Sequence, residues 1–527
     1  MKQRNGLPGR ISKFGVMGLF LLAASVYGPA QGVTPAPAQP SDAMTAAVRE
    51  LQEEVRELRN AVVELRSEAG EYRAQTEQLR RELQASRSSV AVPPDASSTG
   101  VPGATDASNR TQESPGQDHL EDRVGALEES SQLLNSKIAD QYQTKIEAAS
   151  KYRIRLSGIV LLNVFGNHGS VDNQDFPTWA IGPGANLSAK SLGASLRQSE
   201  VGLEVFGPRL AGAKTTGDVQ VDFSGGFTNT SDGVNLGLVR LRIASLRMDW
   251  KNTSIVAGQD DAFISPLSPT SFASLSIPAF GYAGNLWGWI PQVRVEHRFN
   301  LSEGQNITIQ AGMMDNVTGE LPYASFQRPA LAGERSGQPS YAMRVSWTRY
   351  IFGMPFTLGT AGYYSRQKWL FNTHVDGWAG MTDWSIPLAR RVSLTGEFYR
   401  GRAVGGLGGG VGRSVLFTGD PNPYAQLQPL NSVGGWSQVK VKASGKLEFN
   451  GAFGVDSPFA GDARGYPLSP SYFPAALLQN RSGLVNFIYR PRSDLLFSGE
   501  FRHLRTFDLD AGSPSAEQVN LMMGILF

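Results

Sequence analysis

The feature that most constrains this chain is a two-residue alternation of polar and apolar side chains through its last 377 residues. In the stretch YRIRLSGIVLLNVFGN, Ile154 and Leu156 share one face while Arg153 and Arg155 share the other. The same period recurs in six later stretches, which begin near Val219, Val239, Val293, Val345, Val439 and Leu447. In the second of these, Val239, Leu241 and Ile243 are expected to share the apolar face. A period of two with one apolar face predicts β-strands that have one apolar side. Helical periodicity stops at Tyr152, so we expect residues 151–527 to form an all-β domain.

The connections between these stretches decide between a soluble sandwich and a membrane barrel. Very short connections, such as those near Asn252 and Gly353, alternate with long ones, such as 169–194 and 405–434. Tight turns on one rim and long loops on the other are typical of a transmembrane antiparallel β-barrel. We therefore expect about 16 strands, each followed by its connection, with the apolar faces toward lipid and the charged faces toward the interior. In lipid the sheet must close on itself, because unpaired backbone groups cost several kcal/mol each in hydrocarbon. In a soluble sandwich the two faces would be reversed.

The last strand carries a targeting feature. In EQVNLMMGILF the apolar residues Val519, Leu521, Met523 and Ile525 share a face with the terminal Phe527. A terminal aromatic residue on an amphipathic final strand resembles the signal that the barrel-assembly machinery reads in Gram-negative outer-membrane barrels. The whole plan is similar to that of porins with an N-terminal periplasmic coiled coil, notably DcaP-type trimeric porins and sucrose-type sugar porins. The resemblance covers 151–527 and implies an outer-membrane channel, with Phe527 as the membrane-targeting residue.

The first 150 residues predict export and oligomerisation. Basic residues precede a short apolar run, Phe14 to Tyr27, and small residues follow, so we expect 1–32 to be a signal peptide. Residues 41–85 predict a periplasmic coiled coil, because apolar side chains alternate at spacings of three and four; they include Val48, Leu51, Val55, Leu58, Val62 and Leu65. Residues 86–118 predict a flexible Pro/Ser/Gly linker, and 119–150 a second short coiled coil. Valine at heptad position a and leucine at heptad position d favour a two-stranded coiled coil, whereas the resemblance implies a trimer.

Composition excludes several other classes of protein. The chain has no cysteine and only five histidines, without a metal-ligand spacing, so we expect neither a metal site nor a cofactor. The formal net charge of +2 does not indicate a nucleic-acid partner. No nucleotide-binding, calcium or nucleophile-elbow motif occurs, and we expect no catalytic residues and no enzymatic activity.

Candidate pore residues lie on the polar strand faces and in one long connection. By analogy with trimeric porins, the third external loop, Asp260 to Trp287, is expected to fold inward and constrict the channel, with Asp260 and Asp261 at its start. The cations expected to line the pore are Arg240, Arg242, Arg294, Arg298 and Arg344, together with the carboxylate of Glu296. A ladder of arginines attracts anions, unless each one pairs with a neighbouring carboxylate such as Asp222, Glu296 or Glu397. The barrel region holds 33 Lys and Arg against 27 Asp and Glu, which favours a net anion preference.

These observations predict a function and a location. We expect an outer-membrane porin that lets small hydrophilic solutes or ions diffuse passively, assembled as a homo-oligomer with its coiled coil in the periplasm. Its partners would be outer-membrane lipid and the barrel-assembly machinery. The alternative is a structural tether, in which the coil contacts peptidoglycan and the barrel serves only as an anchor. Aromatic residues near strand ends, Trp250, Trp347, Tyr350 and Trp369, suit interfacial girdles or ordinary loop packing.

Overall fold

The computed structural model describes residues 153–182, 189–227, 237–320, 328–418, 424, 426–463, 477–508 and 512–527. The signal peptide, both coiled coils and the linker predicted for residues 1–150 lie outside this described part. No helix within the described residues is both long enough and apolar enough to cross a bilayer.

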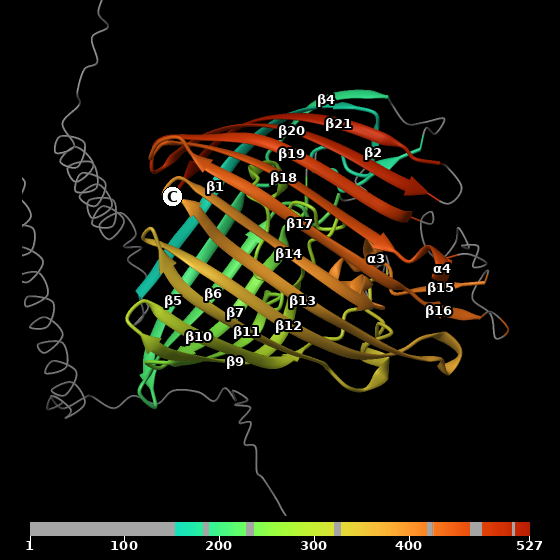
Figure 1. The fold of residues 1–527 in the computed structure, drawn as a ribbon, viewed down its shortest axis with the longest axis horizontal. Helices are drawn as coiled ribbons and strands as arrows, with labels where there is room; N and C mark the ends of the chain where they lie inside the picture. The colour runs from blue at the N-terminus through green and yellow to red at the C-terminus, as the bar shows by residue number, and fades with distance from the viewer. Residues whose placement is uncertain are drawn as a thin grey trace, which may run out of the picture. The chain divides into compact units, whose positions relative to one another are not determined.

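The described chain forms one large antiparallel sheet that closes on itself (Figure 1). Its strands are β1 Arg153–His168, β4 Lys190–Ser195, β5 Glu200–Leu210, β6 Ala213–Asp222, β7 Arg240–Asp249, β8 Thr253–Asp261, β9 Trp289–Ser302, β10 Gln305–Met314, β11 Ser340–Ile351, β12 Met354–Lys368, β13 His374–Ala389, β14 Val392–Arg402, β17 Asn431–Lys442, β18 Leu447–Pro458, β19 Leu477–Arg492, β20 Leu495–Asp508 and β21 Ser515–Leu526. The sheet contains 17 such segments. Because β4 and β5 pair with successive halves of β1, they form one interrupted strand, and the barrel has 16 strands as the sequence predicted.

Short elements lie in the connections. They are β2 Ser170–Val171, β3 Ala180–Ile181, β15 Val415–Phe417, β16 Leu427–Pro429, α3 Gly409–Gly412, α4 Ala460–Ala463, η1 Phe272–Ser274, η2 Glu334–Ser336, η3 Leu370–Asn372 and η4 Gly405–Leu407. The short turns, such as Ala211-Gly212 and Phe352-Gly353, all join strand ends on one rim, which we call the turn end. The long connections lie on the opposite rim, the loop end, and both ends of the described chain lie at the turn end.

Closure joins the first strand to the last. β1 pairs with β21 from Ile159↔Leu526 to His168↔Glu517. Gly158 N–H donates to the Phe527 carbonyl at 2.9 Å, and Phe527 N–H donates back to the Gly158 carbonyl at 3.1 Å. A Cβ on Gly158 would lie 2.8 Å from the Phe527 ring and 2.3 Å from the Glu200 carbonyl, so this contact requires glycine. No strand edge remains open at this seam.

The two faces of the wall have opposite chemistry. Outward side chains are exposed and apolar; examples are Val160, Leu241, Val293, Leu358, Phe398, Val439, Phe487, Phe501, Leu521 and Ile525. Inward side chains are buried and polar; examples are Asn163, Gln292, Asn450, Asn486, Gln518 and Asn520. An apolar exterior and a polar interior suit a barrel in lipid and would be unfavourable for a protein surrounded by water. The predicted orientation of the faces is confirmed.

One strand departs from the predicted alternation. Ile243 was expected to share the outward face of Val239 and Leu241, but it is buried and points inward. Gln220 pairs with Ile243 while Val221 pairs with Leu241, so Arg242 is an extra residue in β7. Such a β-bulge shifts the side-chain phase by one residue. Further along β7, Leu246 therefore takes the outward position.

Candidate functional site: the barrel interior

The connection between β8 and β9, residues 262–288, lies inside the barrel. We call it the inner loop. Its first half is held by side chains of three distant strands: Glu397 of β14 accepts hydrogen bonds from the Ser265 hydroxyl and from Leu267 N–H at 2.8 Å. Gln438 of β17 accepts from Thr270 N–H at 2.6 Å. Glu500 of β20 accepts from the Ser271 hydroxyl at 2.6 Å.

The inner loop then crosses to the opposite wall. Ser271 caps η1. Directly after η1, the side-chain oxygen of Gln198 accepts hydrogen bonds from Leu275 N–H at 2.9 Å and from Ser276 N–H at 3.2 Å. The Ser276 carbonyl accepts from Arg240 Nη2 of β7 at 2.5 Å. The loop therefore spans the interior from β14–β20 to β7, which divides the space inside the barrel.

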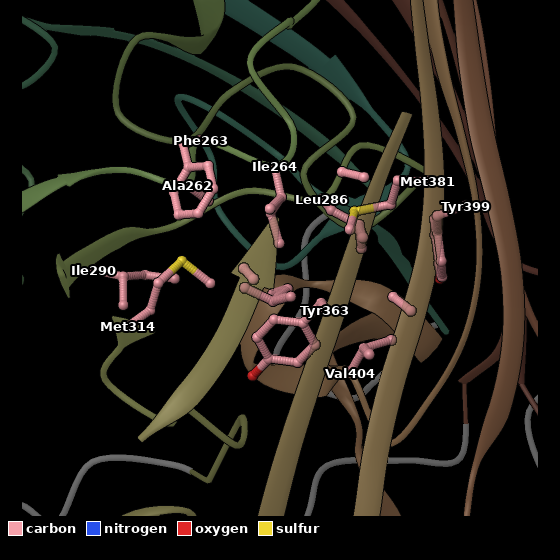
Figure 2. Packing of buried hydrophobic residues seen from close by; sticks show 14 residues of the cluster. Ala262, Phe263, Ile264, Leu286, Ile290, Met314, Tyr363, Met381, Tyr399 and Val404 are labelled. Carbon is pink, nitrogen blue, oxygen red and sulfur yellow. The ribbon is translucent and has the colours of Figure 1, made fainter. Parts of the chain in front are cut away.

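An apolar cluster fixes the inner loop against one part of the wall. Ala262, Phe263, Ile264 and Leu286 of the loop pack among buried residues of β9 to β14, including Ile290, Met314, Tyr363, Met381 and Tyr399 (Figure 2). Val404 and Leu407, from the connection between β14 and β17, complete the cluster. A lumen filled with apolar side chains has the packing of a soluble core. We call the inner face of β11–β14 and β17–β20, with the loops packed on it, the packed side.

A glycine-rich segment lets the second connection reach this cluster. Gly408, Gly410, Val411 and Gly412 all have positive φ, between 51° and 85°. The resulting left-handed turn brings the Leu407 carbonyl to Trp287 N–H of the inner loop, at 3.0 Å. A Cβ on Gly408 would lie 2.4 Å from the Gly281 carbonyl. Glycine is needed here both for its φ and for the close approach of two backbones.

Buried hydrogen bonds hold the same turn. Tyr399 donates its hydroxyl to Asp456 at 2.5 Å and accepts from Gly410 N–H at 3.1 Å. The other oxygen of Asp456 accepts from Val411 N–H at 3.0 Å. The buried polar groups of this turn therefore have protein hydrogen-bond partners.

Ion pairs line the other part of the interior, on β5 to β9. Arg240 donates to both oxygens of Asp222 at 3.1 and 2.5 Å, and Arg242 pairs with Glu200. The two guanidinium groups lie 4.8 and 4.7 Å from the ring centroid of Trp289. We call this inner face of β5–β9 the solvated side, because its side chains retain exposure: 25% for Arg240 and 23% for Glu200.

The second group on the solvated side is centred on Arg294. Its Nη1 donates to Asp260 at 2.8 Å and to Gln292 at 3.0 Å, and its Nε donates to Glu296 at 2.8 Å. Asp261 follows at the end of β8 and is exposed. The structure thus brings together Arg240, Arg242, Arg294, Asp260, Asp261 and Glu296, and it pairs each of these three arginines with a carboxylate.

The two remaining predicted arginines lie elsewhere. Arg344 of β11 donates to both oxygens of Asp383 at 2.9 and 2.7 Å, and the exposed fractions of the two side chains are only 9% and 4%. Arg344 also donates to Gln310 at 3.1 Å, and Gln310 donates to Glu296 at 3.0 Å, so Arg344 lies on the packed side where it borders the Arg294 group. Arg298 lies near the turn end of β9, where it is exposed and has no carboxylate within ion-pair distance among the described residues. The five predicted arginines therefore do not form one continuous row: three are paired on the solvated side, Arg344 is paired with Asp383, and Arg298 lies at the turn end.

A second basic group at the turn end was not among the predicted sites. Lys440 and Lys442 of β17 and Arg490 of β19 lie close enough to influence one another electrostatically, and Glu448 lies 3.7 Å from Lys440. The Arg490 guanidinium lies 5.6 Å from the ring of Phe272 in the inner loop, so this group faces the interior. The sequence signal was present, since Lys440 and Lys442 occupy the polar face of a period-two stretch.

The aromatic residues considered for the interfacial girdle behave differently from one another. Tyr350 is 57% exposed at the turn end, and Trp347 packs edge-on against Phe356 there. Trp250 donates its indole N–H to the Ala211 carbonyl of a neighbouring short turn at 2.9 Å. Trp369 is buried at 1% exposure among Ala332, Val375 and Phe417, so it packs a loop and is not part of a girdle.

This geometry defines a membrane β-barrel with an internal loop, and comparisons with known proteins agree with that fold. No family model and no curated protein sequence matches the chain. Among solved structures, the outer membrane channel DcaP of Acinetobacter baumannii is 17% identical with a TM-score of 0.53, over 72% of this chain and 99% of that chain. The anion-selective porin from Comamonas acidovorans is 13% identical with a TM-score of 0.42, over 72% and 100%. Salmonella typhi OmpF is 10% identical with a TM-score of 0.42, over 71% and 98%.

The resemblance to DcaP-type porins that the sequence indicated is confirmed at the level of the fold. The chain has the closed 16-strand barrel of Gram-negative outer-membrane porins.

Proposed function

We propose that this chain is an outer-membrane channel for passive diffusion of small hydrophilic solutes. The observation that carries the proposal is the division of the interior by the inner loop. On β5–β9, Arg240, Glu200, Asp260 and Glu296 keep exposed fractions of 25%, 23%, 19% and 16%, whereas Glu500 and Arg502 on the packed side are 0% and 4% exposed. A barrel of 16 strands is wide enough for an aqueous channel, and the inner loop narrows it to the solvated side.

We propose further that the channel has a small preference for anions. The ion pairs at Arg240, Arg242 and Arg294 neutralise much of the field along the solvated side. The remaining positive potential comes from the turn end, where Lys440, Lys442 and Arg490 oppose Glu448, and where Arg298 adds another cation. Cations at the mouth of a pore with low-dielectric walls raise the local anion concentration.

The alternative of a structural tether needs no route for water through the barrel. The exposed charges on β5–β9 favour the channel, since a sealed anchor gains nothing from charges held in water. We propose that the chain acts as a homo-oligomer, a trimer, with residues 41–85 as a periplasmic coil that promotes assembly, after the barrel-assembly machinery has read Phe527. Contact between the coil and peptidoglycan would add a tethering role.

The experiment is single-channel recording of the full chain in planar bilayers under a KCl gradient. We expect stepwise conductance and a reversal potential of the sign for anions. The variant K440Q/K442Q should move the reversal potential toward cations without abolishing conductance, while R390Q/R391Q, in the turn between β13 and β14, removes the same number of charges as a control. Absence of conductance from a folded chain would contradict the channel, and a cation-selective wild type would contradict only the anion preference.

A further inference from the structure

The outer surface of the barrel carries an aromatic belt at the loop end of β11–β13. The strand register places Tyr341 opposite Tyr364, and Tyr364 opposite Trp378. All three point outward and are 44%, 40% and 40% exposed. Toward the barrel centre the same outward faces carry Met343 and Leu358, which are exposed and apolar. A row of aromatic side chains bordering an apolar band marks the level of the lipid headgroups.

A group of cations lies along this belt. Lys368 pairs opposite His374, and Arg366 pairs opposite Asp376, both beyond the belt toward the loop end. Arg402 lies opposite Trp378, and Arg400 lies one outward position below it. These side chains share the lipid-facing side of the wall, because their neighbours on the alternate positions, such as Gln367 and Tyr399, are buried inside. We call Arg366, Lys368, His374, Arg400 and Arg402 the outer cationic patch.

The outer cationic patch has little negative charge of its own. Asp376 is the carboxylate within it, and it accepts a hydrogen bond from the Tyr364 hydroxyl at 3.0 Å. None of the five basic side chains forms an ion pair with a carboxylate of the described chain. Arg400 instead donates to the carbonyls of Gly401 and Ser432, with its guanidinium 4.2 Å from the Phe459 ring and 5.5 Å from the Trp378 ring.

A similar arrangement occurs on another part of the outer surface. Arg481 and Arg505 are directly opposite each other on β19 and β20, both are exposed, and both guanidinium groups lie about 5 Å from the ring of Phe507, at 5.0 and 5.1 Å. Like charges directly opposite across a sheet are unfavourable. Charged side chains at a lipid boundary are favourable when the headgroups there carry the opposite charge. Both patches therefore fit a surface that meets anionic headgroups.

We propose that the outer cationic patch binds the phosphate groups of lipid headgroups in the leaflet at the loop end. Arginine is suited to this role because its planar donor fork matches phosphate in a bidentate geometry. The aromatic belt would contact the upper acyl and sugar region of the same lipid, while the cations meet its phosphates. The proposal rests on the membrane placement in the proposed function but not on conductance.

The test uses the full chain, folded and purified in detergent, and native mass spectrometry with diphosphoryl lipid A as the probe. The double variant R366Q/R402Q removes two cations that form no ion pair within the described structure; Arg366 also interacts with the Tyr364 hydroxyl. We expect its affinity for the probe to fall roughly 25-fold, since each surface cation contributes about fivefold. R366K/R402K should retain most of the affinity, and R390Q/R391Q, which loses the same charge at the turn end, should retain all of it.

Each outcome decides the proposal. Heat-dependent gel migration shows whether each variant has folded, and the Lys variant provides the decisive comparison if the Gln variant does not fold. Equal affinity of the wild type and a folded R366Q/R402Q would overturn the proposal, as would equal binding of a phosphate-free lipid. If inorganic phosphate displaced lipid A at a concentration similar to that of lipid A, the site would be one for free anions, and this result would also overturn the proposal. Conductance of R366Q/R402Q should equal that of the wild type, so failure of the channel proposal is measured separately.

Discussion

The packed side and the solvated side of the interior are built from the same kind of strand but solve the problem of buried charge in different ways. On the packed side, Arg344 and Asp383 are held out of water beneath the inner loop, with exposed fractions of 9% and 4%. On the solvated side, Arg242 and Glu200 form a similar pair, but their side chains are 13% and 23% exposed. A charge pair on the packed side therefore joins two parts of the wall, β11 and β13, away from water, whereas a pair on the solvated side adjusts the potential of a water-filled space.

The largest expected effect follows from breaking the pair on the packed side. Asp383→Asn leaves Arg344 buried without its counter-charge, which costs roughly 3–5 kcal/mol of folding free energy. Glu200→Gln is the matched change on the solvated side, where Asp222 still lies 3.9 Å from Arg242 and partly replaces the lost charge, so the cost should be only about 1 kcal/mol. Urea unfolding of the two folded variants in lipid vesicles measures both free energies.

The two variants should also differ in their reversal potentials. Glu200→Gln exposes the charge of Arg242 to the channel, so its reversal potential should shift toward anions. Asp383→Asn should leave the reversal potential near that of the wild type. Equal unfolding free energies, or a larger selectivity change in Asp383→Asn, would show that the two sides do not differ as described.

The next effect concerns the backbone contact on which the packed side depends. Gly408→Val places a β-branched side chain at a φ of 85° and brings its Cβ against the Gly281 carbonyl, 2.4 Å away. Strain and clash together should cost about 2–4 kcal/mol and loosen the inner loop. Gly353→Val is the control, because its φ is 75° and nothing lies within 4 Å of the added Cβ. Gly408→Val should raise single-channel conductance and its fluctuations, whereas Gly353→Val should lower stability modestly and leave conductance unchanged.

The wall of the barrel could be predicted from the sequence because strand alternation is a local property. Val293, Arg294 and Val295 already show which face meets lipid, and the short turns show where the strands reverse. The bulge at Arg242 could not be predicted, since one inserted residue changes the phase without any distinctive composition. Ile243 was therefore assigned to the wrong face.

The interior was less predictable because its contacts join residues far apart in sequence. Ser265 meets Glu397 and Ser271 meets Glu500 across 132 and 229 positions, and no pattern in either stretch identifies the partner. The pairing of Arg344 with Asp383 belongs to the same class, because the two residues are 39 positions apart. Lys440 and Lys442 carried a visible signal, but the proximity of Arg490 depends on strand order and on the path of the inner loop.

The smallest expected effect tests how firmly the first external connection belongs to the packed side. Residues 169–182 contact the inner loop through Trp179, whose ring lies edge-on to Tyr282 at 5.4 Å, and Asn480 donates to the carbonyls of both Thr178 and Tyr282. Asp172 holds this turn by accepting from the backbone N–H groups of Thr178 and Trp179 at 2.8 and 3.1 Å. Burial raises the pKa of Asp172 from 3.8 to about 6, although these hydrogen bonds oppose the shift.

Because the folded pKa of Asp172 lies above its unfolded value, the folded turn binds the proton more tightly. Its contribution to stability is therefore complete below pH 4, falls as the pH rises from 4 to 6, and is constant above that range. Amide hydrogen exchange of residues 170–180, corrected for the intrinsic pH dependence of exchange, should show lower protection at pH 7 than at pH 4.5. Asp172→Asn should remove this difference, while exchange in the Gly405–Gly412 segment, which is held by Asp456 and not by Asp172, should respond to pH equally in both proteins; a pH response of residues 170–180 that persists in Asp172→Asn would assign it to another residue.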